Sequence, residues 1–433
     1  MRFTNRSVSG LLFLSLAFAA CGTSVAPPTA KPESTPSPVS PSASVAARSV
    51  VIDGTPARSV ALPWPRIDAR PLAVNGSQAY YLEYPGKDPA TGKKAVPAVY
   101  RLHVADLADG TTADVLTLDP GHMIASGGSS GTSSFGGFVA TPARLFWVEI
   151  WYDRAPNNED TGGDPFGGLP QHWQVVSLDL ADRTRSVVAS GTNHRVAVGM
   201  EGAAVNPPVL AIDGDRVAYT LEAPAPDAPD SNKIVVRSLG DGSVIRTVTT
   251  KRFVSWIGLA GNAIAYREAL GTDLDGATVL DARLMIATTD DGPFEPVDDH
   301  VGSAAITTER LVWGRTNAHD GSAWTRGLSG GSPVQIAGPT DVGFRSTDEP
   351  GILQVSASEG FASWLAVGTV NGSDQSFVPF IWVSGDPAAR LLVPSSSIDT
   401  IAVSSGWLTW HEGDDPPRLR GVTVDEIAAP APR

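Results

Sequence analysis

The chain has 433 residues, with 32 Lys and Arg against 46 Asp and Glu and a formal net charge of −14 at pH 7. A surface of this acidity argues against nucleic acid and anionic phospholipid as partners of the folded region. The sequence contains one cysteine, so no intrachain disulfide can stabilise it, and its folded region needs a large apolar core.

Residues 1–20 have the pattern of a bacterial export signal. A short basic start precedes the apolar stretch 11–20, which is too short to span a bilayer as a permanent helix. The ending Ala19-Ala20-Cys21 resembles the lipobox of bacterial lipoproteins, in which the cysteine is lipidated and the chain is cut before it. This resemblance implies that Cys21 is a lipid attachment site, although Phe18 stands where the family usually has Leu. The alternative is an ordinary signal peptide that is cut after Ala20.

Residues 21–48 comprise the lipidated cysteine and a tether rich in Pro, Ser and Thr. Such a composition cannot bury enough apolar surface to offset the entropy of ordering, and its prolines keep it extended. We therefore expect a disordered tether that holds the folded part away from the lipid. Gly22, in place of Asp, resembles lipoproteins of the outer membrane. The expected location is the bacterial cell envelope, at the outer membrane or the cell surface.

Residues 49–433 contain seven similar segments that align without gaps. Each follows a short apolar run, opens with turn-forming residues and ends on Tyr or Trp. An apolar run, a tight turn and an aromatic-bearing strand are typical of a β-hairpin. The seven segments are 75–81, 141–147, 213–219, 260–266, 307–313, 358–364 and 404–410.

A second hairpin follows each first one, as in 99–104 with 114–118. Four strands per unit at this spacing predict the blades of a β-propeller. The last unit supplies three strands at most and ends near 419–424, whereas the N-terminal segment 57–62 looks like the outer strand 184–189. The predicted fold is therefore an all-β, seven-bladed propeller of four-stranded antiparallel blades, with the ring closed by an N-terminal strand.

One stretch carries a resemblance to a known family. Asp-Gly-Asp-Arg-Val-Ala-Tyr at 213–219, followed by Lys-Ile-Val-Val-Arg-Ser-Leu-Gly-Asp-Gly at 233–242, resembles the repeats of TolB-like propellers. The similarity extends in diluted form over about residues 50–424 and implies the fold without implying an activity. The tether stands where TolB has a small α/β domain, and the Gly-His and Trp-Asp signatures of WD40-like repeats are missing.

The long polar connections lie between the second and third strands of the units, whereas the hairpin turns are tight. Loops on a rigid scaffold often carry function, so we expect the binding face at the end of the ring where these connections lie. The alternative is neutral drift of surface loops. The longest insertion supplies the candidate ligand-binding residues Trp151, Tyr152, Asp153, Asp160, Asp164, His172 and Trp173.

Aromatic rings beside carboxylates suit a sugar, a cationic ligand or a peptide. In the alternative interpretation, Trp151 and Trp173 only pack the base of a disordered acidic loop. Histidines at 122, 172, 319 and 411 lack the local spacing of a zinc site, although a ring can bring distant residues together.

Metal and cofactor signals are weak. Asp273, Asp275 and Asp281 alternate as carboxylates do in calcium loops, but Gly276 occupies the fourth position, and an EF-hand loop has glycine at the sixth. Asp-Gly turns give the same pattern without metal. We therefore expect no cofactor and no metal, with calcium as the alternative.

Two functions remain open at this stage. The first is a monomeric, non-catalytic binding module for an envelope protein, peptide or glycan, which meets the membrane only through its lipid anchor. The second is a propeller enzyme, a hydrolase or lyase acting on a carbohydrate or a lactone, with His and Asp side chains at the mouth of the channel. The sequence assigns no catalytic residue.

Overall fold

The fold was obtained as a computed structural model. It describes residues 48–51, 57–64, 67, 71–83, 100–118, 135–152, 171–193, 208–221, 232–250, 252–272, 279–315, 321–338, 351–370, 374–386, 389–393, 398–412 and 417–428.

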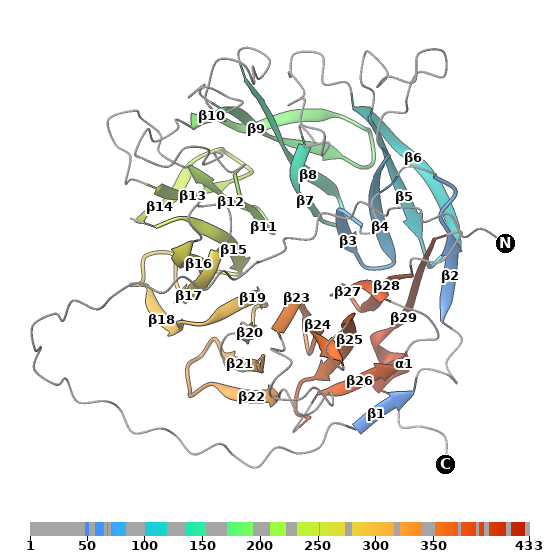
Figure 1. The fold of residues 1–433 in the computed structure, drawn as a ribbon. Helices are drawn as coiled ribbons and strands as arrows, with labels where there is room; N and C mark the ends of the chain where they lie inside the picture. The colour runs from blue at the N-terminus through green and yellow to red at the C-terminus, as the bar shows by residue number, and fades with distance from the viewer. Residues whose placement is uncertain are drawn as a thin grey trace, which may run out of the picture.

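The strands form seven sheets, one of five strands and six of four, which stand as blades around a ring (Figure 1). The strands of each blade are given from the innermost outward. Blade 1 consists of β3 (Ala73–Asn75), β4 (Gln78–Glu83), β5 (Tyr100–Asp106) and β6 (Thr111–Leu118), and blade 2 consists of β7 (Phe135–Ala140), β8 (Arg144–Tyr152), β9 (Gln171–Asp179) and β10 (Arg185–Asn193). Blade 3 consists of β11 (Leu210–Asp213), β12 (Arg216–Leu221), β13 (Asn232–Ser238) and β14 (Val244–Thr250).

Blades 4 to 7 continue in chain order around the ring. Blade 4 consists of β15 (Val254–Ala260), β16 (Ala263–Thr272), β17 (Val279–Ala287) and β18 (Glu295–Asp298), and blade 5 consists of β19 (Val301–Ile306), β20 (Arg310–Arg315), β21 (Ala323–Gly327) and β22 (Val334–Ala337). Blade 6 contains β23 (Gly351–Ser358), β24 (Phe361–Val370), β25 (Asp374–Val383) and β26 (Arg390–Val393). Blade 7 consists of β27 (Ile398–Ser404), β28 (Trp407–Glu412) and β29 (Arg418–Thr423), with β2 (Arg58–Ala61) outermost.

The antiparallel order gives the ring two distinct ends. The turns from first to second strand and from third to fourth strand lie at one end, which we call the turn end. The connection from the second strand to the third lies at the other, which we call the loop end. The turns from first to second strand are tight, as expected: Gly214, in the turn between β11 and β12, has φ of +54°, a conformation that favours glycine. The turns from third to fourth strand are longer, as between Ala287 of β17 and Glu295 of β18.

The N-terminal strand β2 completes blade 7, which confirms the predicted ring closure. It pairs antiparallel with β29, with Val60 opposite Leu419, and the Leu62 N–H donates to the Pro417 carbonyl at 2.9 Å. Val60 and Leu62 are buried among side chains of blades 1 and 7. The N-terminal strand β2 and the last strand β29 therefore share one sheet, and blade 7 has its full set of four strands.

Three elements were not expected from the sequence. Strand β1 (Arg48–Val51) adds to blade 6 as a fifth strand, parallel to β26. The outer strand β18 completes blade 4, and a single helical turn, α1 (Val424–Ala428), follows β29. The four-stranded pattern thus holds for six blades, and blade 6 carries one additional strand on its outer edge.

The seven aromatic residues that end the repeated segments are all buried, one in each interface between neighbouring blades. Each ring packs against the preceding blade: Trp147 lies among side chains of blade 1, Trp313 among those of blade 4, and Tyr81 beside β2 and β29 of blade 7. The hydrophobic core is therefore a set of inter-blade layers with one aromatic wedge each. The wedges are Tyr81, Trp147, Tyr219, Tyr266, Trp313, Trp364 and Trp410.

Hydrogen bonds between innermost strands also hold neighbouring blades together. The Ser303 hydroxyl accepts from the Val355 N–H at 3.0 Å, and the Ser356 hydroxyl accepts from the Val403 N–H at 2.8 Å. Across the closing interface, the Gly76 N–H donates to the Ser404 hydroxyl at 3.3 Å. Polar side chains on the inner strands thus satisfy backbone donors of the next blade.

Several expected features fall outside the described residues, among them Cys21, the tether and part of each long connection at the loop end. The predicted connection 368–378 of blade 6 is mostly strand, because β24 runs to Val370 and β25 begins at Asp374. None of the helices in the described ranges is long and apolar enough to cross a membrane.

Candidate functional site

The loop end of blade 2 brings together two of the predicted ligand-binding residues. Trp151 on β8 lies opposite His172 on β9, and their rings stack with centroids 5.6 Å apart and planes 26° from parallel. Both side chains are partly exposed. The long insertion leaves β8 after Tyr152 and re-enters β9 at Gln171, so this stacked pair stands at its base; Asp153, Asp160 and Asp164 lie outside the described residues.

Trp173 lies on the opposite face of the same blade. Because side chains alternate along a strand, Trp173 points toward blade 3, where it is fully buried. The centroids of the Trp173 and Tyr219 rings are 5.4 Å apart. Its indole N–H donates to the Asn193 side-chain oxygen at 3.2 Å. A Cβ at Gly191 would lie 2.5 Å from the Trp173 ring, so glycine is needed there. Trp173 has the packing role of the alternative interpretation, whereas Trp151 is partly exposed and packs with part of its ring against the core between blades 1 and 2.

A buried carboxylate supports the face that carries Trp151. Glu149 is 1% exposed and accepts hydrogen bonds from the Trp147 indole at 2.9 Å and from the Gln174 amide at 2.6 Å. The Arg185 guanidinium donates to both of its oxygens, at 2.6 and 2.5 Å. Every second residue of a strand lies on the same face, so the side chains of 147, 149 and 151 share one face of β8. The hydrogen-bond network of Glu149 therefore lies next to the stacked pair on that face. His172 is itself oriented by a 3.1 Å contact between its Nδ1 and the Thr192 hydroxyl.

A second polar cluster lies at the interface between blades 7 and 1. The buried ring of His103 contacts the Glu83 carboxylate through Nε2 at 3.2 Å and the Asp114 carboxylate through Nδ1 at 2.9 Å. Trp64, which follows β2, stacks on the same ring with centroids 4.4 Å apart. Glu83 is buried, whereas the Asp114 side chain is 83% exposed. The cluster thus connects the ring-closing segment to solvent through one carboxylate.

Two further polar rings lie beside that cluster. Tyr81 and His411 approach across the closing interface with centroids 6.3 Å apart, and both are almost fully buried. Burial raises the pKa of the Tyr81 phenol. Its hydroxyl has no hydrogen-bond partner among the described residues. Tyr81 thus remains a protonated, apolar-facing wedge at neutral pH.

These buried carboxylates were not predicted from the sequence, although a signal for them is present. A glutamate stands two residues after the wedge aromatic in four of the seven aligned repeats. In blades 2 and 7 this glutamate accepts a hydrogen bond from the tryptophan itself, at 2.9 and 3.0 Å. The four are Glu83, Glu149, Glu268 and Glu412.

The turn end carries a pocket of about 360 Å³ between blades 2 and 3. Phe146 and Leu239 supply apolar walls, and Arg144 and Asp215 supply opposite charges. Asp215 accepts a hydrogen bond from the Ser238 hydroxyl at 2.8 Å. Because Arg144 also contacts Asp179 at 3.9 Å, both charged groups already have partners within the protein.

The histidines predicted near the binding face do not form one cluster. His172 lies in the interface of blades 1 and 2, and His411 lies in that of blades 7 and 1; positions 122 and 319 are outside the described residues. Within the described ranges, no group of three or more His, Cys, Asp and Glu side chains could hold a metal ion.

Comparison with known proteins places this geometry in a broad structural class. No protein-family model and no curated protein sequence matches the chain. Among solved structures, the propeller domain of the Trilobed protease from Pyrococcus furiosus aligns over 84% of this chain and 96% of its own, at 11% identity and a TM-score of 0.51. The similarity shows the β-propeller fold. That domain is described as having an open velcro topology, whereas here β2 closes blade 7.

Two other structures align over similar lengths. Acylaminoacyl peptidase in complex with Z-Gly-Gly-Phe-chloromethyl ketone matches 80% of this chain at 12% identity and a TM-score of 0.50, and the chain spans about half (49%) of that protein. TolB from Acinetobacter baumannii matches 80% of this chain and 79% of its own, at 11% identity and a TM-score of 0.35.

Proposed function

We propose that this protein is a non-catalytic binding module of the bacterial envelope, anchored by lipid at Cys21, which captures a peptide or glycan at the loop end of blade 2. The observation that carries the proposal is the stacked pair of Trp151 and His172 at the base of the longest insertion. A partly exposed aromatic face on a rigid strand binds sugar rings and apolar side chains at a small entropic cost.

The surroundings of the pair favour binding over a purely structural role. Glu149 is fully hydrogen-bonded below it, so the strands that present the pair are held in one conformation. The insertion that starts and ends at the pair contributes Asp153, Asp160 and Asp164. An aromatic platform with carboxylates nearby would select a ligand that combines an apolar face with hydroxyl or ammonium groups.

The proposed anchor is compatible with the course of the N-terminus. Strands β1 and β2 lie on the outer edges of blades 6 and 7, so the chain reaches the ring from its rim. At about 3.1 Å per residue, an extended tether over 22–47 would reach roughly 80 Å. Lipidation is tested by mass spectrometry of the mature N-terminus: the acylated peptide is expected from the native chain and absent from Cys21→Ser, whereas an unmodified Cys21 would contradict the anchor.

Ligand capture is tested on the mature chain with arrays of defined glycans and peptides, followed by fluorescence titration of the bound probe. Trp151→Ala and His172→Ala should each weaken binding by at least tenfold in a protein that still folds, although Trp151→Ala lowers the thermal unfolding midpoint because part of its ring packs against the core. Phe377→Ala is the matched control, because it removes a 36% exposed ring from β25, the corresponding third strand of blade 6. Equal binding by all three variants would refute the site.

One observation favours the alternative function, a hydrolase or lyase acting on a carbohydrate or lactone. His103 contacts two carboxylates, Glu83 and Asp114, and one of them is exposed, which is an arrangement that can relay a proton. Chromogenic glycosides and lactones are the probes. Turnover that disappears in His103→Gln, with folding intact, would support the enzyme; the absence of turnover by the native chain would favour the binding module.

A further inference from the structure

Arg267 is an arginine in the middle of blade 4 that lies mostly inside the protein. It belongs to β16, and its Nε donates a 2.8 Å hydrogen bond to the Ser255 hydroxyl. Ser255 sits in a β-bulge of β15, the innermost strand of the blade, where the register shifts between Val254 and Trp256. The bulge turns the hydroxyl toward the guanidinium, because an extra residue re-aims the side chains around it.

The charges around Arg267 are unbalanced. Trp256, Arg267, Leu284 and Asp298 stand in register across the four strands of the blade and face blade 5. Among the described residues, no carboxylate forms an ion pair with Arg267. The adjacent Glu268 points the other way, since alternate side chains lie on opposite faces of a strand.

The carboxylate that stands in register with Arg267 on the same face already has partners. Asp298 is two strands away from Arg267, or about 10 Å at the usual strand spacing. It accepts from the Trp313 indole at 2.8 Å and from the Arg315 guanidinium at 2.9 Å, both on blade 5. Farther out, Arg326 pairs with Glu295 at 2.5 Å. These pairs leave one positive charge over in the described part of this interface.

Three other arginines of the ring have a carboxylate partner. Arg185 and Arg420 each donate to a buried glutamate, and Arg315 donates to Asp298. Arg267 has a hydroxyl in the place of that carboxylate. Burial lowers the pKa of Arg267 to about 10, yet the side chain remains charged at neutral pH. An unpaired interior cation is destabilising unless an anion accompanies it.

We propose that Arg267 and Ser255 form a binding site for an oxyanion, a carboxylate or phosphate group, beside the innermost strand of blade 4. A guanidinium presents parallel N–H donors that match two oxygens of such a group. The Ser255 hydroxyl donates to the Arg267 backbone carbonyl at a long 3.4 Å, and it adds a third donor to the oxyanion once it rotates. Trp256 borders the site in register with Arg267; a Cβ at Gly258 would lie 2.5 Å from its ring, so the ring is held against its own strand. The site is independent of the one proposed on blade 2.

The experiment measures the thermal unfolding midpoint and tryptophan fluorescence of the mature chain, titrated with sodium phosphate or sodium acetate against sodium chloride at equal ionic strength. A saturable rise in the midpoint with at least one oxyanion is expected. In Arg267→Met the rise should disappear, and without oxyanion this variant should be at least as stable as the native protein, because an apolar side chain of similar length replaces the unpaired cation.

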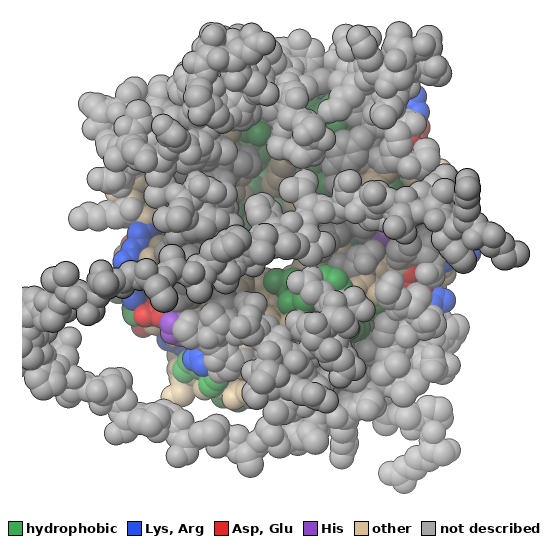
Figure 2. Space-filling view, viewed as in Figure 1, with side chains coloured by type: hydrophobic (Ala, Val, Ile, Leu, Met, Phe, Trp, Pro, Cys, Tyr) green, Lys and Arg blue, Asp and Glu red, His purple; other side chains and the backbone are tan. Residues whose placement is uncertain are grey.

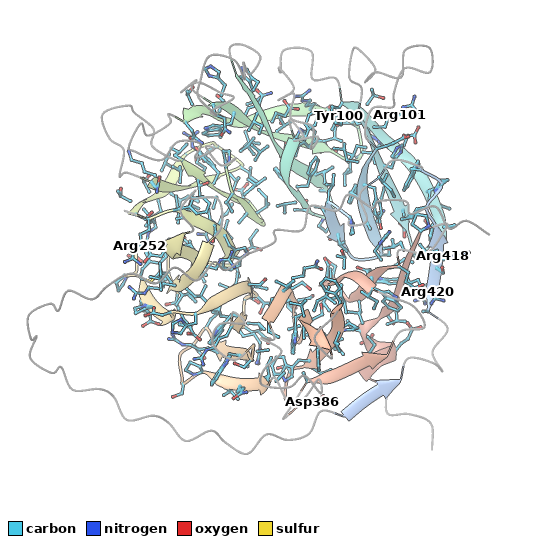
Figure 3. The ribbon with its side chains drawn as sticks, in the orientation of Figure 1. Tyr100, Arg101, Arg252, Asp386, Arg418 and Arg420 are labelled. Carbon is cyan, nitrogen blue, oxygen red and sulfur yellow. The ribbon has the colours of Figure 1, made fainter. Side chains whose placement is uncertain are left out.

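Arg252→Gln is the matched control. Arg252 is exposed and lies in the link from β14 to β15, before the innermost strand of blade 4 begins. Figure 3 labels it at the periphery of the ring, and Figure 2 shows Lys and Arg side chains along the same edge of the view. It should keep the native response to oxyanions. A response to phosphate alone or to acetate alone would each support the site and identify its ligand. An equal response in Arg267→Met, or no response of the native chain to either anion beyond that to chloride, would overturn the proposal.

Discussion

The indole N–H of Trp147 donates a 2.9 Å hydrogen bond to the carboxylate of Glu149, two residues farther along the same strand. Trp410 and Glu412 repeat this relationship at 3.0 Å in blade 7. In blade 6 the equivalent tryptophan is Trp364, and Ala366 stands where the glutamate would be. The indole nitrogen of Trp364 has no hydrogen-bond partner among the described residues. The wedge is thus constant around the ring, whereas its polar partner is not.

Removing the Glu149 carboxylate should destabilise blade 2. Glu149→Ala leaves the indole of Trp147 and the amide of Gln174 without their acceptor, and Arg185 without its counter-charge, so we expect the free energy of unfolding to fall by about 3 kcal/mol. Urea denaturation measures this change. Glu295→Ala, which breaks the more exposed pair with Arg326, is the control and should cost about 1 kcal/mol or less. Equal losses in the two variants would contradict the buried network.

The two kinds of wedge should respond differently to loss of the indole N–H. Trp147→Phe removes both volume and a hydrogen bond to a buried charge, whereas Trp364→Phe removes volume alone. We expect Trp147→Phe to cost about 1–2 kcal/mol more than Trp364→Phe. Both side chains are fully buried, so their cavity terms are comparable. Chemical denaturation of both variants measures the two losses in the free energy of unfolding. A larger loss in Trp364→Phe would contradict this prediction.

Ring closure should depend on β2 far more than on β1. Val60 and Leu62 fill the interface between blades 7 and 1, so Val60→Asp places a charge in that layer and should lower the unfolding free energy by about 3 kcal/mol or more. Deletion of residues 49–51 removes only the added parallel strand of blade 6 and should be mild. Thermal unfolding and light scattering measure the two effects. A stable, monodisperse Val60→Asp protein would exclude the closure described here.

The buried tyrosine wedges should make the protein sensitive to alkali. Burial, with a contribution from Glu268, raises the pKa of Tyr266 to about 12, and burial also raises the pKa of Tyr81 and Tyr219. Between pH 10 and the folded pKa, the unfolded chain releases a proton that the folded chain retains. Stability therefore falls as the pH rises in that window, by about 1.4 kcal/mol per pH unit for each such tyrosine.

Alkaline titration checks this expectation by following phenolate absorbance together with circular dichroism. Ionisation of the buried tyrosines should coincide with unfolding, and Tyr266→Phe should move the unfolding midpoint to higher pH. Phenolate that forms near pH 10 in a protein that is still folded would show that the wedges are accessible to solvent.

Much of the fold was predictable because the same three features recur in each of the seven repeats. The wedge aromatic, the turn before it and the apolar run before that turn recur in register, and the structure places all seven rings in equivalent interfaces. Strand β18 escaped prediction because its sequence, Glu-Pro-Val-Asp, has low β propensity and is held by pairing with β17. Strand β1 repeats the Arg-Ser-Val of β2, and the sequence offers no reason to expect both copies in the ring.

The candidate site was less predictable because it depends on strand register. The pairing of Trp151 with His172 across a long insertion is not fixed by turn geometry, and a shift of one residue would exchange the faces of His172 and Trp173. The prediction from the sequence therefore placed Trp151 and Trp173 in one site, although they lie on opposite faces of blade 2. The imbalance around Arg267 is hidden for the same reason, because it arises from residues of four strands and two blades.

The proposed role of blade 2 is tested most directly by hydrogen–deuterium exchange on the mature chain, with and without the glycan or peptide selected on the arrays. We expect protection at the loop-end segments of β8 and β9, around Trp151 and His172, and its loss in Trp151→Ala. Protection confined to the turn-end pocket around Arg144 and Asp215, or to any blade other than blade 2, would contradict the account.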